Sequence, residues 1–308
     1  MYMSVAELVT AAKETKKPIY ELMIEQEMET SQTSREEIWH TMGRNLDVME
    51  AAVNKGAAGD GVYSTTGLTG GEAVLLKKYR QKGHTLSGDT MMQAVQNAIS
   101  TNEVNASMGV VCATPTAGST GTLPGVIFTL KDRMNLNRDQ MIQFLFTAGA
   151  FGMVIANNAG IAGATGGCQA EVGSASAMGA AAAVEVAGGT PEQSAEALAM
   201  AISNLMGLVC DPVAGLVELP CVKRNAIGVG NALIAADMAL AGCTNKIPAD
   251  EVIAAMDKVG KGLPKALRET GLGGLAATPT GIRMKEKIFG RSTNSQVHAK
   301  KCRRKMMS

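Results

Sequence analysis

The spacing of apolar residues follows a helical period almost throughout the chain, and no stretch alternates apolar and polar residues as a strand would. Four helix starts show an N-cap Ser, Thr or Asn followed three residues later by Glu or Gln, the pattern of a capping box. They lie at Ser4, Ser34, Asn137 and Thr190. Further helices are expected over about residues 89–101, 168–187, 222–242 and 248–260. The pattern therefore predicts an all-α fold, mainly helical with glycine-rich loops.

The connecting segments change in character near residue 61. The first 60 residues have the pattern of an amphipathic helical lead-in rich in Glu and Lys, whereas the later loops are rich in Gly, Ser and Thr. No repeat and no linker separates autonomous units, so a single domain is expected over residues 1–308. Residues 286–308 form a basic tail that is either solvated or rests on a partner.

Composition and charge limit the partners of the chain. The formal net charge is +1 and aromatic residues make up 3% of the chain, so neither attraction to nucleic acid nor base stacking is expected. Residues 140–170 carry no charged side chain and are long enough for a membrane span. Their two asparagines and six glycines favour a buried core helix followed by a glycine-rich loop, without membrane association. The N-terminus lacks the apolar segment of a signal peptide, so a cytoplasmic location is expected.

Three of the six cysteines, Cys168, Cys210 and Cys221, stand in almost uncharged segments rich in Gly, Ala and Pro. Three thiolates can hold an iron–sulfur cluster and leave one metal corner open. Cys168 is expected at a helix N-terminus, where the helix dipole lowers the pKa of a thiol. Structural zinc is disfavoured because no Cys-x-x-Cys pair is present. Spacing alone leaves metal binding and simple packing as equal alternatives, and Cys112 and Cys243 are interpreted as packing residues.

The loop of residues 114–121, Thr-Pro-Thr-Ala-Gly-Ser-Thr-Gly, is a second candidate site. Its small residues let backbone amides face an anion, and its hydroxyls add donors suited to a carboxylate or a phosphate. No Gly-Lys-Ser/Thr follows as in a P-loop, and no strand precedes it as in a dinucleotide-binding fold. Plain turn structure is an equal alternative for this loop.

Longer strings of residues carry a more specific signal. They are Ser-Thr-Thr-Gly-Leu-Thr-Gly-Gly-Glu-Ala (64–73), Asn-Ala-Ser-Met-Gly (105–109), Ala-Thr-Pro-Thr-Ala-Gly-Ser-Thr-Gly (113–121), Gly-Gly-Cys-Gln-Ala-Glu-Val-Gly-Ser-Ala (166–175), Cys-Asp-Pro-Val-Ala-Gly-Leu-Val-Glu-Leu-Pro-Cys (210–221) and Lys-Arg-Asn (223–225). Through these strings, residues from about 60 to 285 closely resemble the α subunit of the iron–sulfur-dependent bacterial L-serine dehydratases, also called L-serine ammonia-lyases.

The resemblance implies a largely helical catalytic domain that holds a 4Fe-4S cluster through Cys168, Cys210 and Cys221. It implies dehydration of L-serine to pyruvate and ammonia, in amino-acid degradation and gluconeogenesis, with an open iron acting as a Lewis acid on the substrate hydroxyl. The residues assigned to the substrate are Asn105, Ser107, Met108, Gly109, Thr116, Gly118, Ser119, Thr120 and Gly121. The group that takes the α-proton is not identified. Lys223 and Arg224 either neutralise the cluster or the substrate carboxylate, or form a charged helix start.

The complete enzymes of this family carry a second module with a Ser- and His-containing loop, and no Ser-Ser-His-Thr string occurs here. A separate β chain is therefore expected, in a heterodimer. Cys302 in the basic tail is either a displaceable fourth ligand of the open iron or, as its terminal position favours, a solvated thiol. The alternatives are a cluster-dependent cysteine desulfidase or threonine deaminase, and a non-catalytic subunit that only holds a cluster.

Overall fold

The computed structural model describes residues 1–290 of the 308-residue chain. In this part of the chain thirteen α-helices are joined by short 3-10, π and irregular segments, and there are no β-strands. The helices are α1 (Val5–Thr15), α2 (Ile19–Ser31), α3 (Arg35–Gly56), α4 (Glu72–Arg80), α5 (Asp89–Ala106), α6 (Thr122–Met134), α7 (Arg138–Asn158), α8 (Gly163–Gly166), α9 (Ser174–Val186), α10 (Pro191–Leu205), α11 (Cys221–Leu240), α12 (Ala249–Gly262) and α13 (Pro279–Phe289). The prediction of an all-α fold is confirmed.

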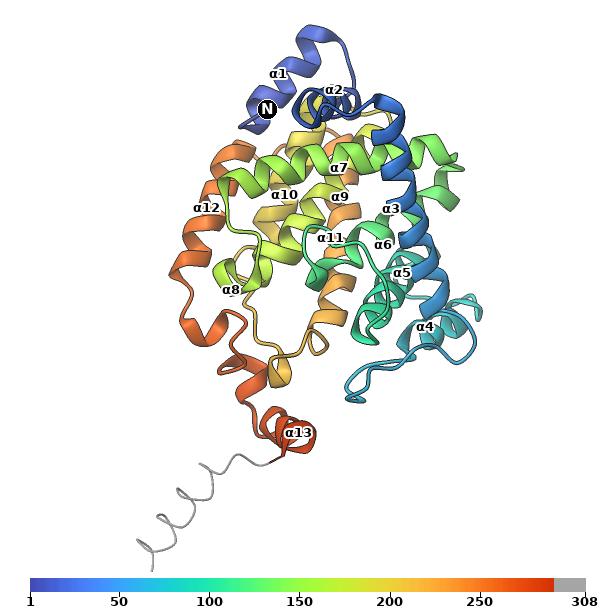
Figure 1. The fold of residues 1–308 in the computed structure, drawn as a ribbon, viewed down its shortest axis with the longest axis vertical. Helices are drawn as coiled ribbons and strands as arrows, with labels where there is room; N and C mark the ends of the chain where they lie inside the picture. Colours follow the sequence, from blue (N-terminus) through green and yellow to red (C-terminus); the bar gives the residue numbers. More distant parts are fainter. Residues whose placement is uncertain (291–308) are drawn as a thin grey trace, which may run out of the picture.

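Helix α9 stands at the centre of the molecule and contacts α6, α7, α10 and α11 (Figure 1). Nine of its thirteen residues are Ala, Ser or Gly, and every residue from Ser174 to Val184 is buried. A helix that is apolar on all sides has no solvent face, so it must be surrounded by other helices. Its small side chains let these neighbours approach closely, and a Cβ at Gly179 would lie 3.3 Å from Val126 Cγ2.

The first three helices pack on this core and share its buried cluster. Two of them are capped by carboxylates from distant helices. Asp250 of α12 accepts hydrogen bonds of 2.7 and 3.0 Å from the first two amides of α1. Glu185 of α9 accepts bonds of 3.1 and 3.3 Å from the first two amides of α2. Because these caps satisfy amides that the helix leaves unpaired, they fix the predicted lead-in to the body of the protein.

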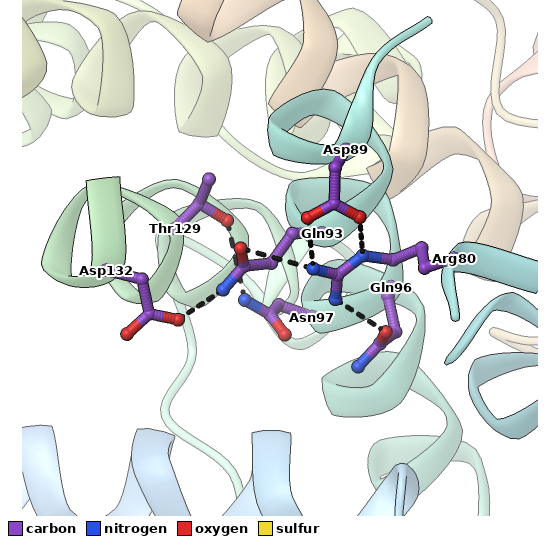
Figure 2. A network of polar contacts seen from close by, with 7 residues as sticks. All are labelled: Arg80, Asp89, Gln93, Gln96, Asn97, Thr129 and Asp132. Atoms are coloured by element: carbon purple, nitrogen blue, oxygen red, sulfur yellow. Dashed lines mark hydrogen bonds and ion pairs between the residues drawn. The ribbon is translucent and has the colours of Figure 1, made fainter. Parts of the chain in front are cut away.

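A polar network ties α4, α5 and α6 together (Figure 2). Arg80, at the end of α4, donates two 2.9 Å hydrogen bonds to Asp89 and one of 2.9 Å to Gln96, both on α5. Gln93, also on α5, contacts Arg80 and donates to Asp132 of α6. The bidentate Arg80–Asp89 pair joins the end of α4 to the start of α5.

The predicted helix starts are confirmed at all four N-caps. Asn137 and Thr190 form complete capping boxes, whereas Ser4 and Ser34 supply only the side-chain acceptor. The uncharged run of residues 140–170 forms α7 and the glycine-rich segment after it, as predicted. Among the described residues α7 is the one helix long and apolar enough to cross a membrane, and 67% of its apolar window is buried inside the fold.

Gly56 marks a close approach of α3 to α5 and gives a stability prediction. A Cβ at this position would lie 2.4 Å from the Ser100 carbonyl oxygen, so Gly56→Ala must force the two helices apart. We expect the free energy of unfolding to fall by about 1–3 kcal/mol in urea denaturation.

Gly149→Ala in α7 is the matched control, because no atom lies within 4 Å of the added Cβ. It should be neutral, or stabilising by up to about 1 kcal/mol, since Ala favours a helix over Gly. Equal losses in the two variants would contradict the close approach at Gly56.

Candidate active site

All three cysteines lie at helix ends or in the loop between them, and all are buried. Cys168 is 3% exposed and precedes a single π-helical turn, Gln169–Gly173, that runs into α9. Cys221 is 6% exposed and begins α11. Cys210 is 2% exposed, and its backbone pairs with Leu267 and Glu269 of the C-terminal segment. Single π-helical turns occur often at functional sites, which agrees with the position of this one between the cysteines and the core.

Burial dominates the thiol chemistry of this region. It raises the pKa of Cys168 to about 12, although the nearby Arg224 opposes the shift. Burial also raises the pKa of Cys210 and of Cys221, and the neighbouring Cys168 raises both further. The prediction that the helix dipole lowers the pKa of Cys168 is therefore wrong, because desolvation outweighs the dipole. The mutual influence of the thiols indicates that they share one dry region.

Two observations bear on whether this region fits a metal group. Within residues 1–290 no three His, Cys, Asp or Glu side chains are arranged to hold a metal ion. A 4Fe-4S cluster has a different requirement, because each thiolate binds a separate iron and the sulfurs surround the cluster. Three buried thiols that influence one another fit this requirement in their chemistry. Gly163 lets Cys210 pack closely against the backbone, since a Cβ there would lie 2.8 Å from Cys210 Sγ.

A buried cation lies among the cysteines. The Arg224 side chain is 15% exposed and forms a 2.7 Å ion pair with Asp211, which is 4% exposed. Arg224 also donates to the Val209 carbonyl at 2.7 Å. Asp211 in turn accepts a 2.7 Å bond from the Leu275 amide, so one carboxylate holds both Arg224 and the C-terminal segment. Arg224 belongs to the cysteine region, whereas Lys223 is an exposed helix-start charge paired with Glu72.

The structure brings the two candidate substrate segments together. Asn105, at the end of α5, donates a 3.1 Å hydrogen bond to the Ala117 carbonyl. Asn225 of α11 is fully buried and donates a 2.8 Å bond to the Gly118 carbonyl. The segments 105–109 and 116–121 therefore lie beside each other and against the helix that Cys221 begins.

The hydroxyl protons of these segments are used inside the protein. Ser119 and Thr120, both fully buried, donate to the carbonyls of Thr114 and Cys112 respectively. Ser107 donates to the Val104 carbonyl. These hydroxyls therefore position the loops, and their assignment to the substrate stays a prediction.

The other predicted substrate residues have different surroundings. Met108 is 87% exposed and adopts a left-handed backbone with φ of 62°. Gly109 and Gly121 lie where an added Cβ would meet atoms at 2.5 and 2.2 Å, so close backbone packing requires glycine at both positions.

Glu171, in the π-helical turn, joins this loop to the cysteine region. It is 8% exposed, and it accepts a 2.7 Å hydrogen bond from the Thr116 hydroxyl and a second bond from the Gly163 amide. Burial raises the pKa of its carboxyl group, and the nearby Glu269 raises it further. The sequence analysis did not select Glu171. The signal was present, because Glu171 is the only charged residue between Asp139 and Glu185.

The glycine-rich loop before α4 also reaches the site. Thr66 donates to both carboxylate oxygens of Glu218, at 2.9 and 2.8 Å, and Glu218 lies between Cys210 and Cys221. Cys112 packs against the main core as predicted, whereas Cys243 is exposed, so its interpretation as a packing residue is wrong. Cys302 lies outside the described residues.

The comparisons with known proteins agree on one relationship. The chain is 62% identical to the "Probable L-serine dehydratase, alpha chain" of Bacillus subtilis (strain 168), over 96% of this chain and 98% of the relative. It is 45% identical to the "L-serine dehydratase, alpha chain" of Peptoniphilus asaccharolyticus, over 91% and 95%. It is also 37% identical to the "L-serine dehydratase" of Streptomyces coelicolor (strain ATCC BAA-471 / A3(2) / M145), where the match covers 88% of this chain and 59% of the relative.

The fold and the site define an all-helical protein in which three buried thiols and two polar loops share one region. The model of the family described as "Serine dehydratase alpha chain" matches residues 14–276. The chain belongs to this family. The match begins well before residue 60, so α2 and α3 of the predicted lead-in lie within the family's domain, whereas most of α1 precedes the match.

The buried pair of Asp211 and Arg224 gives a prediction for stability. Asp211→Ala leaves the guanidinium buried without its counter-charge, and we expect a loss of about 3–5 kcal/mol in the free energy of unfolding. Glu25→Ala, which breaks the half-exposed pair with Lys17, is the control and should cost about 0–1 kcal/mol. Urea denaturation measures the free energy of unfolding of both variants. Similar unfolding midpoints for the two would show that the buried pair does not stabilise the fold more than an exposed pair.

Proposed function

We propose that this chain is the catalytic alpha chain of an L-serine dehydratase, a lyase that converts L-serine to pyruvate and ammonia. The observation that carries the proposal is the hydrogen bond between Thr116 and Glu171. It connects a candidate substrate loop with the turn that follows Cys168, in a chain whose relatives are named L-serine dehydratases. A dehydratase needs its substrate-binding groups and its activating group side by side.

Cys168, Cys210 and Cys221 are the residues that would hold a 4Fe-4S cluster. Such a cluster, when bound, supplies a Lewis-acidic iron that assists the departure of the substrate hydroxyl. The protein around it excludes water, since all three thiols are buried. Arg224 places one fixed positive charge beside the sulfurs. Cys302 is retained as a candidate fourth ligand.

The segments 105–109 and 116–121 are proposed to bind the substrate. Because the hydroxyl protons of Ser107, Ser119 and Thr120 are donated within the protein, we assign binding of the substrate carboxylate to the backbone amides of these segments. The fixed hydroxyl contacts hold the backbone in place before the substrate binds, which lowers the entropic cost of binding.

A β chain is proposed as the partner. Two relatives are named alpha chains, and the match to the Streptomyces coelicolor relative leaves roughly two fifths of that protein without a counterpart here. We infer that a second chain supplies the missing part in a cytoplasmic heterodimer, with no nucleic acid or membrane as partner. The acceptor of the α-proton is one of the functions that this second chain can supply.

An activity assay tests the proposal. The chain, purified without oxygen together with its β chain and supplied with iron and sulfide, should form pyruvate and ammonia from L-serine. L-Threonine and L-cysteine, tested in parallel, separate the dehydratase from a threonine deaminase or a cysteine desulfidase. Absence of pyruvate from a preparation that contains the cluster would reject the dehydratase function.

A spectroscopic measurement tests the ligands. Cys210→Ala should abolish most of the absorbance near ~400 nm that thiolate-bound iron clusters give, while the helical circular dichroism stays unchanged. Cys243→Ala is the control, because its thiol is exposed and remote in sequence from the site. If Cys210→Ala retains the full absorbance, Cys210 is not a ligand.

A further inference from the structure

Glu171 is a buried carboxylate without a cationic partner. None of the ion pairs in residues 1–290 includes it. Its two hydrogen-bond donors, the Thr116 hydroxyl and the Gly163 amide, are both neutral. The buried cation of this region, Arg224, is already paired with Asp211. A buried carboxylate is costly unless a positive charge lies close to it, so this position favours a cationic group from a ligand.

Two glycines pack closely against this carboxylate. A Cβ at Gly118 would lie 2.9 Å from Glu171 Oε1. A Cβ at Gly163 would lie 2.6 Å from Glu171 Oε2 and 2.8 Å from Cys210 Sγ. The carboxylate and the sulfur of Cys210 therefore both lie against Gly163, where no side chain fits without displacing them.

The hydroxyl oxygens beside this carboxylate can accept hydrogen bonds. Thr116 donates its hydroxyl proton to Glu171, so its own oxygen presents only lone pairs to any other group. Ser119 Oγ lies 3.2 Å from that oxygen and donates its proton at 2.9 Å to the Thr114 carbonyl. A carboxylate with acceptor oxygens around it suits a group that carries several N–H donors and a positive charge.

We propose that Glu171, with the Thr116 hydroxyl oxygen, binds the α-ammonium group of the amino-acid substrate. The inference rests on the proposed function and deepens it. The two charges of the amino acid are then bound by different groups, the ammonium by Glu171 and the carboxylate by the backbone of the neighbouring loops.

Two matched ligands test this assignment. L-Alanine and L-lactate share the three-carbon skeleton and the carboxylate of L-serine, and both lack the β-hydroxyl that is eliminated. They differ at the α-carbon, which carries an ammonium group in L-alanine and a hydroxyl group in L-lactate. In the cluster-loaded enzyme with its β chain, L-alanine should bind at least about tenfold more tightly than L-lactate. Glu171→Gln should weaken the binding of L-alanine at least about tenfold. The same substitution should change the affinity for L-lactate by less than about twofold. Calorimetry gives both affinities, and competitive inhibition of serine dehydration gives an independent measure.

Glu185→Gln is the matched control. Glu185 is also a largely buried carboxylate that accepts from a threonine hydroxyl and from backbone amides, but it caps α2 away from the cysteines. The Glu185→Gln substitution should leave the preference for L-alanine over L-lactate unchanged. Thr116→Val, which keeps the Glu171 charge, should give a smaller loss that is again confined to L-alanine.

The outcomes separate this inference from the proposed function. The ammonium site is overturned if Glu171→Gln weakens the binding of both ligands equally. It is also overturned if the unaltered enzyme shows no preference for L-alanine over L-lactate. If the unaltered enzyme prefers L-alanine but forms no pyruvate from L-serine, the ammonium site stands and the dehydratase function fails. If Glu171→Gln does not retain the cluster absorbance, the selective loss in Thr116→Val decides the question.

Discussion

The close packing of helices around α9 is the constraint on which the rest of this structure depends. A central helix of Ala, Ser and Gly lets α6, α7, α10 and α11 approach closely, and short side chains lose little conformational entropy on burial. The same helix continues at its N-terminal end into the π-helical turn that carries Glu171 and follows Cys168. The candidate site is therefore an extension of the rigid core, and its geometry depends on that packing.

Buried carboxylates have two different roles in this fold. Glu103 is fully buried and caps α4 through two backbone amides, although burial raises its pKa to about 6. Glu185 and Asp250 cap α2 and α1, and Asp211 neutralises Arg224. Each of these four holds helix-start amides or a cation. Glu171 also accepts from a helix-start amide, that of Gly163 in the short α8, and the buried Glu218 accepts from the Thr66 hydroxyl. What distinguishes Glu171 is its position beside Cys210 and the loop of Thr116, where the proposal assigns it to the substrate ammonium.

Sequence reasoning succeeded where the signal is local. Helical periodicity and N-caps predicted most of the long helices, since both depend on residues within one or two turns, but they did not predict α4, α6, α8 or α13. The helix expected over 168–187 begins with a π-helical turn that carries Glu171, and the partner of Glu171, Thr116, lies 55 residues away in the sequence. The cap of Asp250 on α1 spans 245 residues, and no local pattern predicts it. The local helix dipole predicted a lowered pKa for Cys168. Burial raises that pKa instead, and burial is determined only by the tertiary structure.

Glycines of this chain occur both where helices pack closely and at the candidate site, and the composition does not distinguish the two cases. At Gly56 and Gly228 an added Cβ would meet a neighbouring helix, so glycine there permits the helices to approach. At Gly118 and Gly163 the Cβ would meet the Glu171 carboxylate, and at Gly163 also the sulfur of Cys210. In both cases the absence of a side chain lets another part of the protein approach the backbone. At Gly56 and Gly228 the approach brings helices together, whereas at Gly118 and Gly163 it places a buried carboxylate, and at Gly163 also a sulfur, against the backbone of the candidate site.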